Sequence, residues 1–101
     1  MTVAETMRAK LAARFAPLRL DIVDDSHRHA GHAGAHPDGE SHFTVTLVAA
    51  AFTGLGRVAR QRLVYAALAE ELATRVHALS LRVLAPDEAP GSLDVSKNYN
   101  R

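Results

Sequence analysis

The sequence predicts an α+β fold in which helices cover one face of a mixed three-stranded sheet. Apolar residues recur at helical spacing in two segments and alternate with polar residues in three others. The second and third alternating segments flank a helical one, and this order forms a right-handed crossover that pairs the two strands in parallel. The chain has 101 residues, 48% of them hydrophobic, which is enough for one domain with one core.

The first helix and the first strand lie near the N-terminus. Thr2 and Glu5 have the spacing of a capping box, and apolar residues then follow at steps of four: Val3, Met7, Leu11 and Phe15. Pro17 ends this helix. Leu20 and Ile22 then alternate with polar neighbours, which predicts a strand with one buried side.

A long loop and a second strand come next. Residues 27–41 show no periodicity and consist mainly of histidine, glycine, alanine and charged residues, so a surface loop is expected. Alternation resumes afterwards, with Phe43, Val45 and Leu47 facing inward and with His42, Thr44 and Thr46 facing outward. The simplest arrangement pairs this strand antiparallel with the first.

A long helix and a third strand complete the sheet. Gly54 and Gly56 mark a turn, and the spacing of the apolar residues that follow predicts one helix from about Arg57 to Thr74. Residues 76–84 are predicted as a strand whose inward side carries His77, Leu79, Leu81 and Val83. The other face of the sheet offers polar residues, so the helices are expected on one side only.

The C-terminal residues are less regular. Pro86, Asp87 and Glu88 can begin a short last helix, and residues 91–101 form a polar tail. The domain is therefore assigned to residues 1–90.

Composition excludes some classes of function. The formal net charge of +1 gives no general attraction to nucleic acid or anionic lipid, although ten of the twelve basic residues are arginine. No apolar run has membrane-spanning length, and no secretory signal is evident at the N-terminus, so a cytoplasmic protein without membrane contact is expected. No catalytic motif stands out, and an enzyme is not expected.

Histidine is the most distinctive residue type in this chain. Five of its six histidines lie between residues 27 and 42, the sixth is His77, and there is no cysteine. Neutral imidazole is a common ligand of transition metals, so a histidine-rich loop and one distant histidine could form a split ligand set. The alternatives are an inert soluble loop and, for His77, a core histidine bonded to a backbone carbonyl.

The long helix carries an inverted charge pattern. Arg57, Arg60 and Arg62 lie near its start, and Glu70 and Glu71 lie near its end. This order opposes the helix dipole, so the arginines are candidates for an external contact such as nucleic-acid phosphate. Salt-screened, solvated arginines are the alternative.

Several short segments, in their order and spacing, resemble the BolA family. They cover most of the chain up to about Pro86 and read Glu40-Ser41-His42-Phe43, Phe52-Thr53-Gly54, Arg60-Gln61-Arg62-Leu63-Val64-Tyr65, Leu68-Ala69-Glu70-Glu71-Leu72 and Val76-His77-Ala78-Leu79-Ser80-Leu81. The resemblance implies class II KH-like topology, αββαβ with a possible last helix. It also implies a role in iron-sulfur cluster assembly, trafficking or iron sensing, as an adaptor that binds a monothiol glutaredoxin.

The resemblance further implies a 2Fe-2S cluster that the two proteins hold together. Glutaredoxin and glutathione would supply thiolates, and this chain would supply His77 and one histidine of the loop between the first two strands. Ser26-x-x-His29 matches the family position by counting from the first strand, whereas His32 matches by its neighbours, so both are retained. His42 is assigned to the signature of the fold, and His27 and His36 are treated as bystanders. No cluster is expected in the isolated chain, which would be a monomer or a weak homodimer.

Two other functions remain open. A DNA-binding transcriptional regulator would use Arg57, Arg60 and Arg62 as phosphate contacts, although Gly54 and Gly56 do not have the Gly-x-x-Gly spacing of KH modules. A zinc or nickel buffer built from the loop alone would bind metal without His77.

Overall fold

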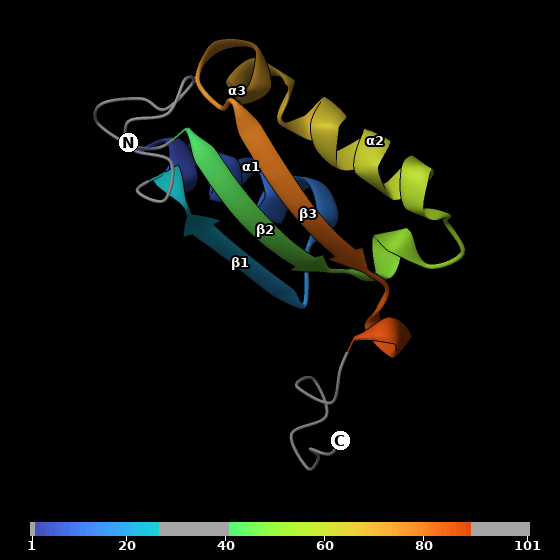
Figure 1. The fold of residues 1–101 in the computed structure, drawn as a ribbon. Helices are drawn as coiled ribbons and strands as arrows, with labels where there is room; N and C mark the ends of the chain where they lie inside the picture. The colour runs from blue at the N-terminus through green and yellow to red at the C-terminus, as the bar shows by residue number, and fades with distance from the viewer. Residues whose placement is uncertain (1, 27–40, 90–101) are drawn as a thin grey trace.

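A computed structural model of the chain describes residues 2–26 and 41–89. Three strands form one sheet, and the helices lie against one of its faces (Figure 1). The α+β prediction is therefore confirmed. The elements in chain order are α1 (Val3–Phe15), β1 (Arg19–Asp24), β2 (His42–Val48), η2 (Ala50–Phe52), α2 (Arg57–Ala67), α3 (Ala69–Thr74), β3 (Ala78–Leu84) and η3 (Pro86–Glu88).

The sheet has the predicted mixed topology, with strand order β1-β2-β3. β1 pairs antiparallel with β2, placing Leu20 opposite Leu47, and β2 pairs parallel with β3, placing Val45 opposite Leu81. The predicted inward residues of β2, Phe43, Val45 and Leu47, are buried. Ser80 and Arg82 on the opposite face of β3 are exposed, as expected of a sheet covered on one side.

α1 begins and ends where the sequence predicts. Thr2 and Glu5 form the reciprocal capping box, with the Glu5 N–H donating to Thr2 Oγ1 over 3.0 Å. Ala16, with φ of 46°, closes the helix in the left-handed region before Pro17. Its buried face carries Met7, Leu11 and Phe15, and the Phe15 ring packs on that of Phe52 at 4.9 Å.

The prediction of one continuous helix over residues 57–74 is wrong, because Leu68 interrupts it. Leu68 has φ of −108° and ψ of 21°, and separate helices lie on either side. The break keeps Leu68 fully buried and starts α3 just before Glu70 and Glu71. Both carboxylates accept hydrogen bonds from Lys10 Nζ on α1, at 2.8 and 2.7 Å. The glutamates thus lie in a first helical turn, where negative charge is favourable.

The prediction that His77 faces the core is also wrong. β3 begins at Ala78, one residue later, and the His77 side chain is exposed. Val76 takes the buried position instead, at 5% exposure. The alternation of a strand does not extend to 77, because this residue precedes the regular ladder at the end of the sheet.

Within residues 2–26 and 41–89, no helix is both long enough and apolar enough to cross a membrane. The predicted polar tail, residues 91–101, lies outside the described residues.

Candidate metal centre

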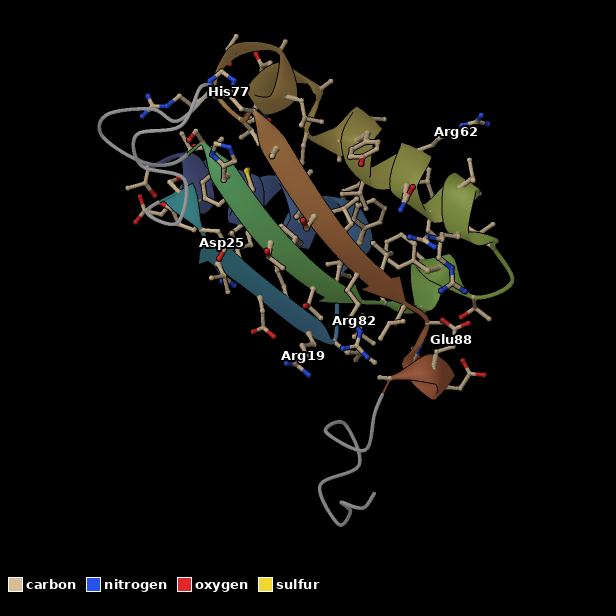
Figure 2. The ribbon with its side chains drawn as sticks, viewed as in Figure 1. Arg19, Asp25, Arg62, His77, Arg82 and Glu88 are labelled. Atoms are coloured by element: carbon tan, nitrogen blue, oxygen red, sulfur yellow. The ribbon has the colours of Figure 1, made fainter. Side chains whose placement is uncertain are left out.

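His77 lies where β2 and β3 begin, at the end of the sheet opposite Arg82 and Glu88 (Figure 2). Its backbone is fixed by the neighbouring strand, since Ser41 O accepts the N–H groups of His77 and Ala78 at 2.7 and 3.2 Å. Its imidazole is exposed. A side chain that is accessible on an ordered backbone can bind a group brought by another molecule.

The two ends of the histidine-rich loop meet close to His77. Ser26 is buried two residues after the end of β1. Its Oγ accepts hydrogen bonds from the N–H groups of Ser41 and His42, at 2.8 and 3.1 Å. Asp25 adds a hydrogen bond from its N–H to His42 O, at 2.7 Å. The same Ser41 that closes the loop also holds the His77 backbone. The loop therefore leaves and rejoins the sheet beside His77.

The predicted loop ligands, His29 and His32, lie outside the described residues, as do His27 and His36. The described loop ends therefore fix only where that segment is attached. The segment between Ser26 and Ser41 is long enough to fold back to the point where it is attached to the sheet.

His42, assigned from the sequence to the signature of the fold, lies close to His77. The ring centres of the two histidines are 6.3 Å apart, with planes tilted by 36°. His42 Nδ1 is 2.9 Å from Ser41 Oγ, and the side chain is half-buried. The missed signal is the strand register: parallel pairing places His42 opposite Ala78, directly beside His77. Treating His42 only as a fold signature overlooked this proximity.

The site offers nitrogen ligands. A neutral imidazole presents one lone pair to a metal and can donate its other N–H to a second protein group. The described ranges contain no group of three or more His, Cys, Asp or Glu side chains in metal-binding geometry. The sequence has no cysteine, so a thiolate at a shared site must come from another molecule.

The predicted arginine set is divided by the structure. Arg60 is buried and donates to Leu55 O at 2.8 Å, to Val83 O at 3.1 Å and to the Glu88 carboxylate at 2.5 and 2.9 Å. It connects α2 to β3 and η3 instead of forming an exposed phosphate contact, which corrects its assignment. The hydrogen bonds from Arg60 and from the Ala85 N–H lower the pKa of Glu88 to about 2.

A cleft of about 460 Å³ lies between α2 and β3 at this end of the sheet, and Arg57, Gln61 and Arg82 are among its lining residues. In the described part of the chain no ion pair engages Arg57 or Arg82. Arg62 is directed away from the sheet on the outer side of α2 (Figure 2). The structure thus separates Arg62 from Arg57. It also adds Arg82 to the candidate phosphate contacts, and the charge pattern of the helix could not indicate this residue because it lies on β3.

The element order and the mixed sheet define a class II KH-like α+β domain with histidines at one end of the sheet. The chain belongs to the BolA family: the family description "BolA-like protein" matches residues 11–88. This finding confirms the resemblance seen in the sequence.

Individual relatives agree with this membership. The chain is 47% identical over 89 residues to the protein BOLA1, chloroplastic, of Arabidopsis thaliana; the match covers 86% of this chain and 56% of that relative. It is 45% identical over 94 residues to the DNA-binding transcriptional regulator BolA of Escherichia coli strain K12, covering 93% and 86% of the two chains. Its fold matches the solved BolA domain of SufE1 from Arabidopsis thaliana with a TM-score of 0.76 at 40% identity, covering 84% and 93%.

Proposed function

We propose that this chain is a non-enzymatic adaptor for iron-sulfur cluster trafficking or iron sensing. It binds a monothiol glutaredoxin and contributes histidine ligands to a 2Fe-2S cluster between the two proteins. The observation that carries this proposal is the position of His77: its imidazole is exposed, its backbone is held by Ser41, and the histidine-rich loop is attached at the same place.

The residues fit a shared cluster. His77 supplies one imidazole and either His29 or His32 supplies the second, while the partner's cysteine and glutathione supply the thiolates that this sequence lacks. When bound, a cluster with two imidazoles on one iron has a higher reduction potential than an all-thiolate cluster. Because the His77 side chain is exposed, it can reach a cluster without any opening of the hydrophobic core. In the proposed role the isolated chain carries no cluster and is a monomer or a weak homodimer.

Reconstitution tests the proposal. The chain is mixed with a monothiol glutaredoxin, glutathione, iron and sulfide, and visible absorption and circular dichroism follow the cluster. The His77→Ala variant is expected to lose the spectrum characteristic of the mixed complex, whereas His36→Ala is expected to keep it. An unchanged spectrum with His77→Ala would reject His77 as a ligand.

Acidification supplies a second readout for the same complex. Ligation requires neutral imidazole, so cluster retention should fall as the pH is lowered from 8 to 5.5. The glutaredoxin-only cluster, with thiolate ligands, is the control. Absorption that stays constant over this range in the mixed complex would argue against imidazole ligation.

A second candidate function is binding of DNA by a transcriptional regulator. Two exposed arginines at this end of the sheet favour it: Arg57 begins α2 beside the cleft, and Arg82 lies on the open face of β3. A relative with 45% identity carries the name DNA-binding transcriptional regulator. The corrected arginine set for this function is Arg57 and Arg82, with Arg60 serving the fold.

Salt dependence separates this function from the first. Each phosphate contact contributes about −0.9 to the slope of log K against log salt, so Arg57→Ala and Arg82→Ala should each reduce the slope by about 1. Arg62→Ala, which changes an arginine directed away from the cleft, is the matched control. Equal slopes for all four proteins would rule out the cleft as the phosphate-binding surface.

A further inference from the structure

β3 is an edge strand of the sheet, because the strand order of the described chain is β1-β2-β3. On the side of β2, Leu84 O accepts the N–H of Ala49 at 3.0 Å. Alternate residues of a strand direct their N–H and C=O groups to opposite sides, so Leu81 and Val83 direct theirs to the outer edge. The hydrogen bond from Arg60 Nη1 to Val83 O, at 3.1 Å, agrees with this direction.

The cleft of about 460 Å³ between α2 and β3 lies along this edge. α2 lies beside β3 on the side away from β2 (Figure 1), and Leu81 and Val83 are among the residues that line the cleft. Leu55 adds an apolar side chain, and the half-buried Gln61 adds an amide. Because Arg60 already donates to Val83 O, Leu81 provides the open main-chain groups at the edge. An open strand edge beside a partly apolar cleft is the arrangement to which an extended peptide adds as a further strand.

We propose that this cleft binds an extended segment of a partner protein, which adds a strand to the outer edge of β3. Main-chain hydrogen bonds with Leu81 supply affinity, and alternate side chains of the segment supply specificity. Leu81 packs against the core, so the side chain opposite it also lies on the helix-covered face of the sheet and is apolar. The inference goes beyond the proposed function, because it requires neither a cluster nor His77.

Arg57 determines the charge of the segment. It is exposed at the start of α2 and lines the cleft, and no ion pair engages it within the described part of the chain. The first turn of α2 contains no acidic residue. Glu88 also lines the cleft, but its carboxylate is paired with Arg60. The segment therefore carries an acidic side chain two residues from the apolar one, on the same face of the added strand.

The probe is the heptapeptide Thr-Glu-Thr-Val-Thr-Glu-Thr with blocked ends. A glutamate on each side of the valine allows the peptide to bind in either direction along β3. It is titrated into the complete ¹⁵N-labelled chain without glutaredoxin, glutathione or iron, and saturable shifts of the Leu81 and Val83 amide signals are expected. His77 lies at the opposite end of the sheet (Figure 2), so failure of this test would leave the cluster proposal unaffected.

Two N-methylated peptides test the addition of a strand. One carries the methyl group on the nitrogen of the valine, and the other carries it on the nitrogen of the threonine that follows. Alternate N–H groups of a strand point to opposite sides, so only one of these two groups faces β3. One peptide should therefore bind about tenfold more weakly than the parent, whereas the other should bind like the parent. Equal affinities of the two N-methylated peptides would contradict strand addition.

Two arginine variants test the charge of the segment. Arg57→Ala should weaken binding of the heptapeptide by about two- to fivefold, the effect of one exposed ion pair. Arg62→Ala, which changes an arginine on the outer side of α2, should leave the affinity unchanged. With both glutamates of the peptide replaced by glutamine, wild type and Arg57→Ala should bind equally.

Two outcomes would overturn the proposal. One is that the heptapeptide produces no shift of the Leu81 amide signal at millimolar concentration. The other is that this signal shifts only when a short DNA duplex is added, which would assign the cleft to nucleic acid.

Discussion

At the scale of single residues, exposure decides which polar side chains are available for function. His77 and Arg60 illustrate the two outcomes. Both belong to segments that suggested function in the sequence, but His77 is exposed and Arg60 is buried among Leu55 O, Val83 O and Glu88. The imidazole is therefore accessible from outside the fold, whereas the guanidinium maintains the fold.

His77→Ala should change stability very little. The side chain is exposed, and the hydrogen bonds at this position come from the backbone, which the substitution keeps. The free energy of unfolding in urea should stay within about 0.5 kcal/mol of wild type, as for most surface substitutions. A large loss of stability would mean that the ring has a structural role, and the effect of the variant on cluster binding would then need another explanation.

Glu88→Gln should alter the pH dependence of stability. The pKa of Glu88 is about 2 in the fold against an ordinary value of 4.5, so the unfolded chain takes up the proton first as the pH falls. The stabilising contribution is complete above about pH 4.5 and disappears as the pH falls towards 2. Urea unfolding at a series of pH values should show wild type more stable than the variant at pH 5 and the two converging near pH 2. Parallel curves over this range would contradict the Arg60–Glu88 pairing.

At the scale of elements, the break at Leu68 explains a charge pattern that the sequence left unresolved. Seen as one helix, residues 57–74 place glutamates at the unfavourable end. Seen as α2 and α3, Glu70 and Glu71 lie in the first turn of α3 and pair with Lys10. Apolar spacing continues through the break, so periodicity alone could not locate it.

Leu68→Ala tests the importance of this junction. Leu68 is fully buried where α2 meets α3, so truncation leaves a cavity and should cost about 2–5 kcal/mol. Val58→Ala is the matched control, because Val58 on α2 is 58% exposed and should change stability by less than about 0.5 kcal/mol. Chemical denaturation measures both. Similar small effects for the two variants would show that the junction is not packed as described.

At the scale of the whole molecule, much of the sheet could be predicted from the sequence because alternation identifies buried strands directly. Leu20 and Ile22 of β1 and Val45 of β2 lie on the inward face of the sheet, as predicted. The strand-helix-strand order also predicted the parallel pairing of β2 with β3. The candidate site was harder to predict. Alternation fails at His77, one residue before β3, and the nearness of His42 depends on the register between strands.

The attachment of the loop and the proposed cluster site belong to the same scale, because both depend on how distant segments of the chain meet. Hydrogen bonds among Ser26, Ser41 and His77 join the loop ends to the start of β3, and no local pattern in the sequence encodes them. The resemblance to the BolA family indicated both the histidine-rich loop and His77. The structure adds the hydrogen bonds of Ser26 and Ser41 that connect the ends of this loop to His77.

Pulsed EPR on the reduced cluster tests the central claim most directly. This chain is labelled with ¹⁵N-histidine and combined with unlabelled monothiol glutaredoxin and glutathione, so every labelled ligand comes from this chain. The account predicts strong hyperfine coupling from two ¹⁵N nuclei in the wild-type complex and from one in the His77→Cys complex, where a thiolate replaces the imidazole. A wild-type spectrum without strongly coupled ¹⁵N would contradict it.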